Sequence, residues 1–224
     1  QGSFILDTGA EKLVLNDRHF RPDYINEGTA AAGVTGSVDL VGKKRVSELG
    51  LDAFRLEGVR ADVIDLSHIE KKKNHRVLGL LGFSVLENFE FFVDFKLRQL
   101  IFTKVDKGGN RLDSLPWLDQ PEDTLDFRLR RHVIEIGAEV GEEKVLFGLD
   151  TGAEINLLDR RVKRGAMQHF KILKRVLLNG TGGEATEVLA GKLYKVRCGP
   201  KYCSGMRTLV TNMDDINAVY GTRL

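Results

Sequence analysis

The segment Phe-Ile-Leu-Asp-Thr-Gly-Ala-Glu at residues 4–11 returns as Phe-Gly-Leu-Asp-Thr-Gly-Ala-Glu at residues 147–154. When the comparison is extended to residues 4–18 and 147–161, nine of the fifteen aligned positions are identical without a gap. Self-similarity of this kind is typical of a duplicated structural unit. We therefore expect two copies of one supersecondary unit in the chain.

Glycine-rich segments follow both copies of the motif. Gly33-Val34-Thr35-Gly36 follows the first copy, and Gly180-Thr181-Gly182-Gly183 follows the second. In each half a stretch of alternating polar and apolar residues comes next, through Val46 and through Val196. Because the order of features is the same, the duplication extends beyond the motif itself.

The composition is that of a packed protein. The chain has 224 residues, of which 42% are hydrophobic and 29% charged, enough for one large domain or two lobes of about 100 residues. The apolar fraction is too high for a disordered chain. The net charge of +2, with no long basic stripe, gives no reason to expect a nucleic-acid partner. No apolar run approaches about 18 residues, so we expect no membrane span.

Metal and disulfide chemistry have little support in the sequence. Two cysteines are too few for a disulfide framework or a four-ligand zinc site, and the five histidines show no ligand spacing. We therefore expect no metal and no cofactor. Cys198 and Cys203 bracket Gly-Pro-Lys-Tyr, and a hairpin with this turn would hold them opposite each other for a disulfide. Two reduced thiols are the alternative.

Most segments read as strands. The alternation in residues 133–136, and in part of 188–196, predicts strands, and the Phe-rich residues 89–102 predict a hairpin. Short helices are expected after each Asp-Thr-Gly-Ala and around residues 84–88. The run Lys71-Lys72-Lys73 is expected in a solvated loop. The predicted fold class is therefore mainly β with a few short helices.

A polar stretch separates the two copies. Asp106-Lys107-Gly108-Gly109-Asn110 is rich in turn residues, and a proline-containing acidic segment follows. We expect an N-terminal lobe at 1–106, a linker at 107–130 and a C-terminal lobe at 131–224. The first half continues into the apolar run at 77–83, whereas the second half stops at Leu224. We therefore expect the C-terminal lobe to lack its final strand.

The repeated motif carries its own chemistry. An Asp between an apolar strand and Thr-Gly is a carboxylate on a tight turn, where glycine permits close approach and threonine supplies a hydroxyl. Two such turns related by a pseudo-twofold axis would bring Asp7 and Asp150 face to face, and the pair would then share a proton. A carboxylate beside a carboxylic acid can act on one water as general base and general acid together.

The motif resembles that of the aspartic protease superfamily. Ala10 and Ala153, which follow the glycines, are more similar to retropepsins than to pepsins, which usually carry serine there. Two motifs in so short a chain look like a fused, single-chain retropepsin pair of the bacterial exported aspartyl protease type. The segment at 77–83 (Val-Leu-Gly-Leu-Leu-Gly-Phe) is similar to the apolar-apolar-Gly segment that crosses behind the catalytic loop in this family.

The resemblance implies a fold, an activity and a set of roles. The fold would be two homologous β-barrel-like lobes, and the activity that of an aspartic endopeptidase with a periplasmic or extracellular location. Asp7 and Asp150 would hold the water. The supporting turns would consist of Thr8, Gly9, Ala10, Thr151, Gly152 and Ala153, with the threonines interlocking across the lobe interface. The two glycine-rich segments would be flaps over an extended polypeptide substrate, and one chain would contain the complete site.

Other functions remain open at this point. A catalytically degenerate scaffold of the same fold would bind peptides without forming product. A third hypothesis is an interaction domain of a larger protein. Actin-like kinases also carry Asp-x-Gly turns in two lobes, but their folds are α/β. The common nucleotide, serine-hydrolase and zinc-peptidase motifs are absent from the sequence.

Overall fold

The computed structural model describes residues 2–25, 30–33, 36–113, 122–179, 185–221 and 224. Across these residues the chain is mainly β, with four short helices, as the sequence predicts. None of the helices in these ranges combines the length and the apolar character needed to cross a membrane.

Seven strands of the first half form one sheet. The path through this sheet is β1-β7-β2-β6-β5-β3, and β4 pairs with β5. Strand β7 lies parallel to β1 and antiparallel to β2, so it joins the two segments that flank the first motif. The bounds are β1 (Ser3–Leu6), β2 (Leu13–Asn16), β3 (Tyr24–Ile25), β4 (Ala30–Gly33), β5 (Gly36–Leu51), β6 (Phe54–Ile64) and β7 (Val77–Leu81).

The strands of the second half form two separate sheets. One has the path β10-β11-β16-β17 with β12 on β11, and the other has the order β13-β18-β15-β14. The bounds in the first of these are β10 (Phe127–Arg130), β11 (Val133–Val140), β12 (Glu143–Leu149), β16 (Val196–Cys198) and β17 (Lys201–Cys203). Those in the second are β13 (Asn156–Asp159), β14 (Phe170–Asn179), β15 (Ala185–Leu193) and β18 (Met206–Thr211).

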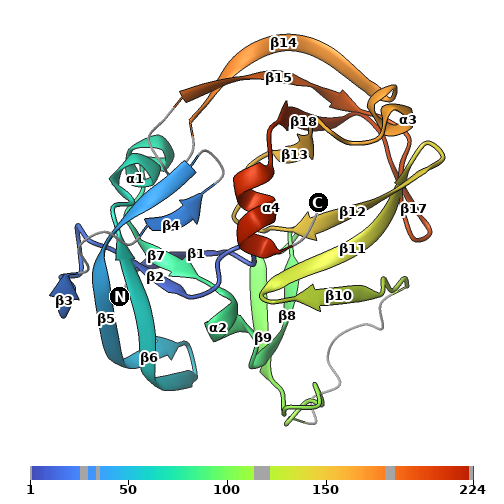
Figure 1. Ribbon diagram of the computed structural model, residues 1–224. Coiled ribbons are helices and arrows are strands. Elements are labelled where there is room, and N and C mark those ends of the chain that lie inside the picture. Colours follow the sequence, from blue (N-terminus) through green and yellow to red (C-terminus); the bar gives the residue numbers. More distant parts are fainter. Residues whose placement is uncertain (1, 26–29, 34–35, 114–121, 180–184, 222–223) are drawn as a thin grey trace.

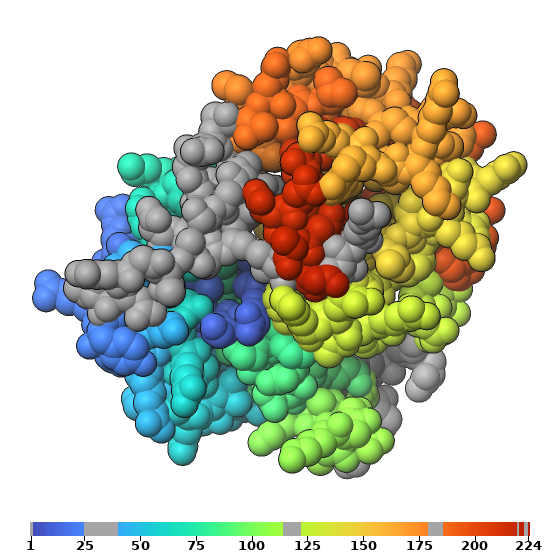
Figure 2. All heavy atoms as spheres, viewed as in Figure 1, coloured from blue at the N-terminus to red at the C-terminus, as the bar shows by residue number. Residues whose placement is uncertain are grey.

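A hairpin and four helices complete the described chain. The hairpin consists of β8 (Phe89–Asp94) and β9 (Gln99–Lys104). The helices are α1 (Ser67–Lys73), α2 (Phe83–Leu86), α3 (Arg164–Met167) and α4 (Asp214–Tyr220). Figure 1 shows the first half (blue to green) beside the second (yellow to red), and Figure 2 shows α4 (red) at the surface near their junction. Each half has its own apolar core.

The sequence repeat corresponds to a structural repeat. Strands β2 and β13 begin and end at positions that the motif alignment makes equivalent, and each pairs in parallel with a later strand, β6 or β18. Helices α1 and α4 have the same length and follow the equivalent strands β6 and β18, with the alignment shifted by four residues. Both end at a residue in the left-handed conformation, Asn74 and Gly221, which asparagine and glycine adopt at low cost.

A buried polar side chain ends β2 and β13 at equivalent positions. Asn16 has no exposed surface, and its amide donates to the carbonyl of Val77 at 3.0 Å. Its counterpart Asp159 accepts from Asn217 at 3.2 Å and from the backbone N–H of Arg161 at 2.8 Å. Buried polar groups require such partners, so each side chain fixes the loops packed around it.

The helices expected directly after each Asp-Thr-Gly-Ala are wrong, because those residues form the strands β2 and β13. In the first half the reason is burial: the three leucine and valine side chains of residues 13–15 are almost fully buried, and β2 pairs with β6 on one side and β7 on the other. Tertiary packing thus determines the conformation of this short apolar run. The helix expected around residues 84–88 is α2, and the hairpin expected at 89–102 is β8–β9.

Two further expectations need correction. Lys71-Lys72-Lys73 is the last part of α1 and not a loop. The final four residues of the segment expected to be a linker, 107–130, form β10, which pairs with β11 along its whole length. The isolated segment Phe-Arg-Leu-Arg is too short to show a clear period, so its pairing could not be read from the sequence.

The close approach of β7 to β2 can be tested at Gly79. A Cβ there would lie 1.9 Å from the carbonyl oxygen of Val14, which is backbone and has little freedom to move. We expect Gly79→Ala to lower the free energy of unfolding by about 3 kcal/mol or more in a urea titration. At Gly137 in β11 nothing lies within 4 Å of the added Cβ, so Gly137→Ala should change stability by less than about 1 kcal/mol. Equal losses in the two variants would contradict this packing.

Candidate active site

The two aspartates of the repeated motif stand on turns of the same geometry. Asp7 follows β1 directly, and its Oδ1 accepts from the N–H groups of Gly9 at 2.9 Å and Ala10 at 3.1 Å. Asp150 follows β12 directly, and its Oδ1 accepts from the N–H groups two and three residues later, at 2.8 and 3.1 Å. In each turn the backbone therefore fixes the direction of the carboxylate.

The two turns face each other across the halves of the molecule. A Cβ at Gly9 would lie 2.7 Å from the Cγ of Asp150, and a Cβ at Gly152 would lie 2.5 Å from the Cγ of Asp7. Each motif glycine thus leaves room for the opposite carboxylate. The Asp150 side chain lies close enough to Asp7 to raise the pKa of Asp7.

Reciprocal threonine hydrogen bonds join the two turns. The Thr8 hydroxyl donates to the carbonyl of Leu149 at 2.8 Å and accepts from the N–H of Thr151 at 3.1 Å. The Thr151 hydroxyl donates to the carbonyl of Leu6 at 2.8 Å and accepts from the N–H of Thr8 at 3.1 Å. Four bonds related by the pseudo-twofold axis therefore set the separation of the carboxylates.

The environment of the pair favours one proton on it. Burial, followed by the charge of Asp150, raises the pKa of Asp7 to about 6, although backbone N–H donors oppose the rise. Two neighbouring carboxylates titrate as a unit, because ionisation of the second one places two negative charges side by side. The pair can therefore hold one carboxylate and one carboxylic acid under mildly acidic conditions.

Helix α4 of the second half braces the turn of the first. The Tyr220 hydroxyl donates to the carbonyl of Gly9 at 3.3 Å, and its ring packs edge-on against His132 with centroids 5.3 Å apart. Burial, together with the charges of Asp150 and Asp7, raises the pKa of Tyr220 to about 12, so the hydroxyl keeps its proton. Burial also lowers the pKa of the His132 imidazole.

Helix α1 of the first half braces the turn of the second. Glu154, which follows Asp-Thr-Gly-Ala, accepts from Lys73 at 2.9 Å and also from Lys72. These hydrogen bonds lower the pKa of Glu154 to about 2. Each helix therefore contacts the motif of the opposite half. Sequence reasoning missed Tyr220, His132 and Glu154. An alignment of α1 with α4 places Tyr220 and Lys73 at equivalent positions, and each of these two side chains contacts the motif of the opposite half.

The predicted flaps are described only in part. Gly33 and Gly36 pair with each other at the tip of the β4–β5 hairpin, next to which α4 lies. Val34 and Thr35 fall outside the described residues, as do Gly180, Thr181, Gly182 and Gly183. The last described pair of the β14–β15 hairpin is Asn179 with Ala185, so the second glycine-rich segment connects these two strands.

The cysteines do not face each other as expected. In the β16–β17 hairpin Cys198 pairs with Lys201 and Cys203 pairs with Val196, and both thiols are free. The turn between β16 and β17 is two residues shorter than it would have to be for Cys198 to pair directly with Cys203. The two thiols therefore lie diagonally across the hairpin. In the described part of the chain no group of three His, Cys, Asp or Glu side chains could hold a metal ion.

Comparison with known proteins adds no match: no protein-family model fits this chain, and no curated protein sequence matches it. The interpretation of the site therefore depends on the geometry of the two turns.

The threonine interlock predicts a coupled loss of stability. Thr8→Val removes one donor and one acceptor, and we expect it to cost about 2 kcal/mol because each buried hydrogen bond contributes about 1 kcal/mol net. Thr151→Val should cost less, because Thr151 is exposed and water can replace its hydrogen bonds. The double variant should cost less than the sum, because the first change already loosens the contact that the second removes. Thr8→Ser keeps the hydroxyl and serves as the control; strict additivity in urea titrations would contradict the interlock.

The raised pKa of Asp7 predicts a pH-dependent effect of Asp7→Asn. Because its pKa rises from 3.8 to about 6 on folding, ionisation of Asp7 reduces stability as the pH increases through this interval. A rise of about two pKa units corresponds to at most about 3 kcal/mol. We expect the neutral variant to be more stable than the parent at about pH 7 and nearly equal to it at about pH 3.5, as measured by urea unfolding. A variant no more stable at neutral pH would contradict the assignment.

Proposed function

We propose that this protein is an aspartic endopeptidase that hydrolyses peptide bonds with a water held between Asp7 and Asp150. The observation that carries the proposal is the pair of facing carboxylates on turns locked together by Thr8 and Thr151. The acid-protease fold, with two barrel-like lobes divided near residues 107–130, belongs to the same proposal. The structural repeat and the family resemblance of the motif support it.

The chemistry follows from one shared proton. The ionised carboxylate takes a proton from water as the water oxygen bonds to the carbonyl carbon, and the protonated carboxyl gives its proton to the carbonyl oxygen. In the resulting tetrahedral diol, the C–N bond breaks as the nitrogen gains a proton from one carboxyl and the other carboxylate takes one from a hydroxyl. The products are a carboxylic acid and an amine, and the pair again holds one proton.

The proposed substrate is an extended polypeptide. The β4–β5 and β14–β15 hairpins, which carry the glycine-rich segments, would bond to it as to an added strand. Both carboxylates come from one chain, so this proposal needs no second copy to complete the pair. A periplasmic or extracellular location, which the family resemblance implies, is part of the proposal.

A peptide-binding scaffold without catalysis is the second candidate, and one observation favours it. Thr8 in the first turn is 4% exposed, whereas Thr151 and Asp150 in the second turn are exposed to solvent. A carboxylate in contact with water pairs less strongly with its partner. The scaffold predicts saturable peptide binding with no product at any pH.

Cleavage of an unstructured protein separates the two candidates. We expect the parent chain to form products that mass spectrometry detects, with activity falling as the pH rises above about 6, because the pair then loses its shared proton. Asp7→Asn and Asp150→Asn should each reduce the rate by about 100-fold or more.

The matched control is Asp52→Asn. Asp52 is exposed in the β5–β6 turn with φ of 50°, a conformation that asparagine tolerates, so this variant should cleave like the parent. Comparable turnover by Asp7→Asn and the parent would exclude the carboxylate pair as the catalytic group. Peptide binding without product across the pH range would instead support the scaffold.

A further inference from the structure

The β8–β9 hairpin is separate from the larger sheets. Within the described residues β8 and β9 pair only with each other. One end of the hairpin is anchored: Phe89 and Thr103 are buried, and Phe91 and Phe102 pack against the core of the first half. The strands form six residue pairs, so at about 3.4 Å per residue the other end lies about 17 Å from this anchor.

The far end of the hairpin exposes apolar side chains. The β8–β9 tip, residues 95–98 (Phe-Lys-Leu-Arg), connects the two strands. The side chains of Phe95 and Leu97 in this tip are 88% and 62% exposed. Val93 and Leu100, which pair across the hairpin next to the tip, are 37% and 40% exposed. Four large apolar side chains therefore meet water at one end of the hairpin, and covering them with an apolar phase would be favourable.

Hydrogen bonds give the β8–β9 tip a defined shape. The Oδ1 of Asp94 accepts from the N–H groups of Lys96 and Leu97, both at 2.8 Å. Arg98 has φ of 55°, the left-handed conformation, and its backbone leads into β9. A loop that is already ordered loses little conformational entropy when it binds a surface. The apolar side chains are thus presented by a structured turn.

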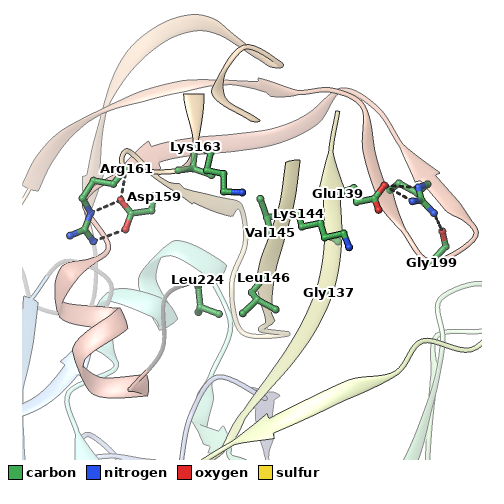
Figure 3. A pocket seen from close by; sticks show the side chains of 13 residues that line it. Gly137, Glu139, Lys144, Val145, Leu146, Asp159, Arg161, Lys163, Gly199 and Leu224 are labelled. Atoms are coloured by element: carbon green, nitrogen blue, oxygen red, sulfur yellow. Dashed lines mark hydrogen bonds and ion pairs between the residues drawn. The ribbon is translucent and has the colours of Figure 1, made fainter. Parts of the chain in front are cut away.

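Basic side chains alternate with the apolar ones in the tip. Lys96 and Arg98 are exposed, and neither forms an ion pair with another described residue. Figure 3 shows the opposite arrangement at a hollow of about 760 Å³ in the second half, where Arg161 is bonded to Asp159. The only acidic residue between positions 93 and 100 is Asp94, so this end of the hairpin has a net positive charge.

We propose that the β8–β9 tip docks on an anionic lipid surface, with Phe95 and Leu97 inserted below the headgroups and with Lys96 and Arg98 at the lipid phosphates. Segments that bind the membrane interface combine apolar and basic side chains in this way. Lysine and arginine can lay their aliphatic stems along hydrocarbon while their charged groups stay in water. An anionic surface attracts each basic side chain that comes near it.

The size and charge of the tip favour a lipid surface over a protein partner. A four-residue loop is small beside the roughly 20 to 30 residues that each partner contributes to a stable protein–protein interface. A second copy docked through the same loop about a twofold axis would place Lys96 and Arg98 against the same two basic side chains. These like charges would repel each other. A lipid interface takes up a small loop without a matching partner surface and supplies the opposite charge.

Co-sedimentation with vesicles tests the proposal. We expect the parent chain to sediment with vesicles of equal parts phosphatidylcholine and phosphatidylglycerol, and much less with phosphatidylcholine alone or at raised salt. Phe95→Ser and Leu97→Ser should each lower the partition coefficient about 10-fold, because each removes apolar surface from the lipid. Lys96→Gln should lower it about 5-fold through the lost attraction to the phosphates.

Matched controls lie at the anchored end of the same hairpin. The N–H of Leu112 donates to the carbonyl of Lys104, the last residue of β9, and Leu112 is 60% exposed, close to the 62% of Leu97. Lys107 is exposed and, like Lys96, forms no ion pair among the described residues. Leu112→Ser and Lys107→Gln should therefore bind the vesicles like the parent.

The remaining outcomes would overturn the proposal. A parent chain that stays in solution with anionic vesicles would do so, as would a loss of binding in Leu112→Ser equal to that in Leu97→Ser. Equal binding to both kinds of vesicle would remove the role of Lys96 and Arg98. Self-association in sedimentation velocity that Leu97→Ser abolishes would assign the tip to a second copy instead. Vesicle binding needs no catalysis and can be measured in Asp7→Asn, so it is independent of the proposed peptidase activity.

Discussion

The rest of the structure depends on holding two carboxylates against each other. Like charges at such short range repel, so the turns that carry them would separate without an opposing constraint. The reciprocal bonds of Thr8 and Thr151 supply this constraint, and each threonine binds the carbonyl that precedes the opposite aspartate. The motif glycines permit the approach because any side chain at Gly9 or Gly152 would occupy the space of the facing carboxylate.

The braces around this centre are related in position but not in chemistry. Tyr220 holds the first turn by a neutral hydroxyl within a buried, aromatic surrounding, whereas Lys72 and Lys73 hold the second turn through charges on Glu154. The halves share one scaffold, yet burial lifts the pKa of Asp7, and its partner stands in contact with solvent. The duplication therefore supplies the geometry of the pair, and the difference in burial between the two turns makes the pair electrostatically unequal.

Much of the carboxylate pair could be predicted from the sequence, because the motif combines an apolar strand, an aspartate and a turn in eight consecutive residues. Such local patterns survive without tertiary information. Strand β2 could not be predicted in the same way, since its conformation is imposed by two neighbouring strands from residues 54–64 and 77–81. The contacts of Tyr220 and Glu154 were also hidden, because they join segments that are distant in the sequence. The sequence offset between equivalent residues of the two halves changes between β13 and β18. A search for repeats at one fixed offset therefore misses the equivalence of the later elements.

The change in offset makes the two halves unequal in length. Between Asp159 and Thr211 the chain has four more residues than between their counterparts Asn16 and Ile64, and the additional length lies in the region of α3 and the β14–β15 hairpin. A cleft with true twofold symmetry would accept a polypeptide in either direction, because reversal of the guest would present the same walls to it. The described pairing of β14 with β15 is longer than that of β4 with β5, so the two hairpins are unequal. Under the proposed function, a polypeptide between them would meet a different surface on each side, and its N-to-C direction would affect how well it binds.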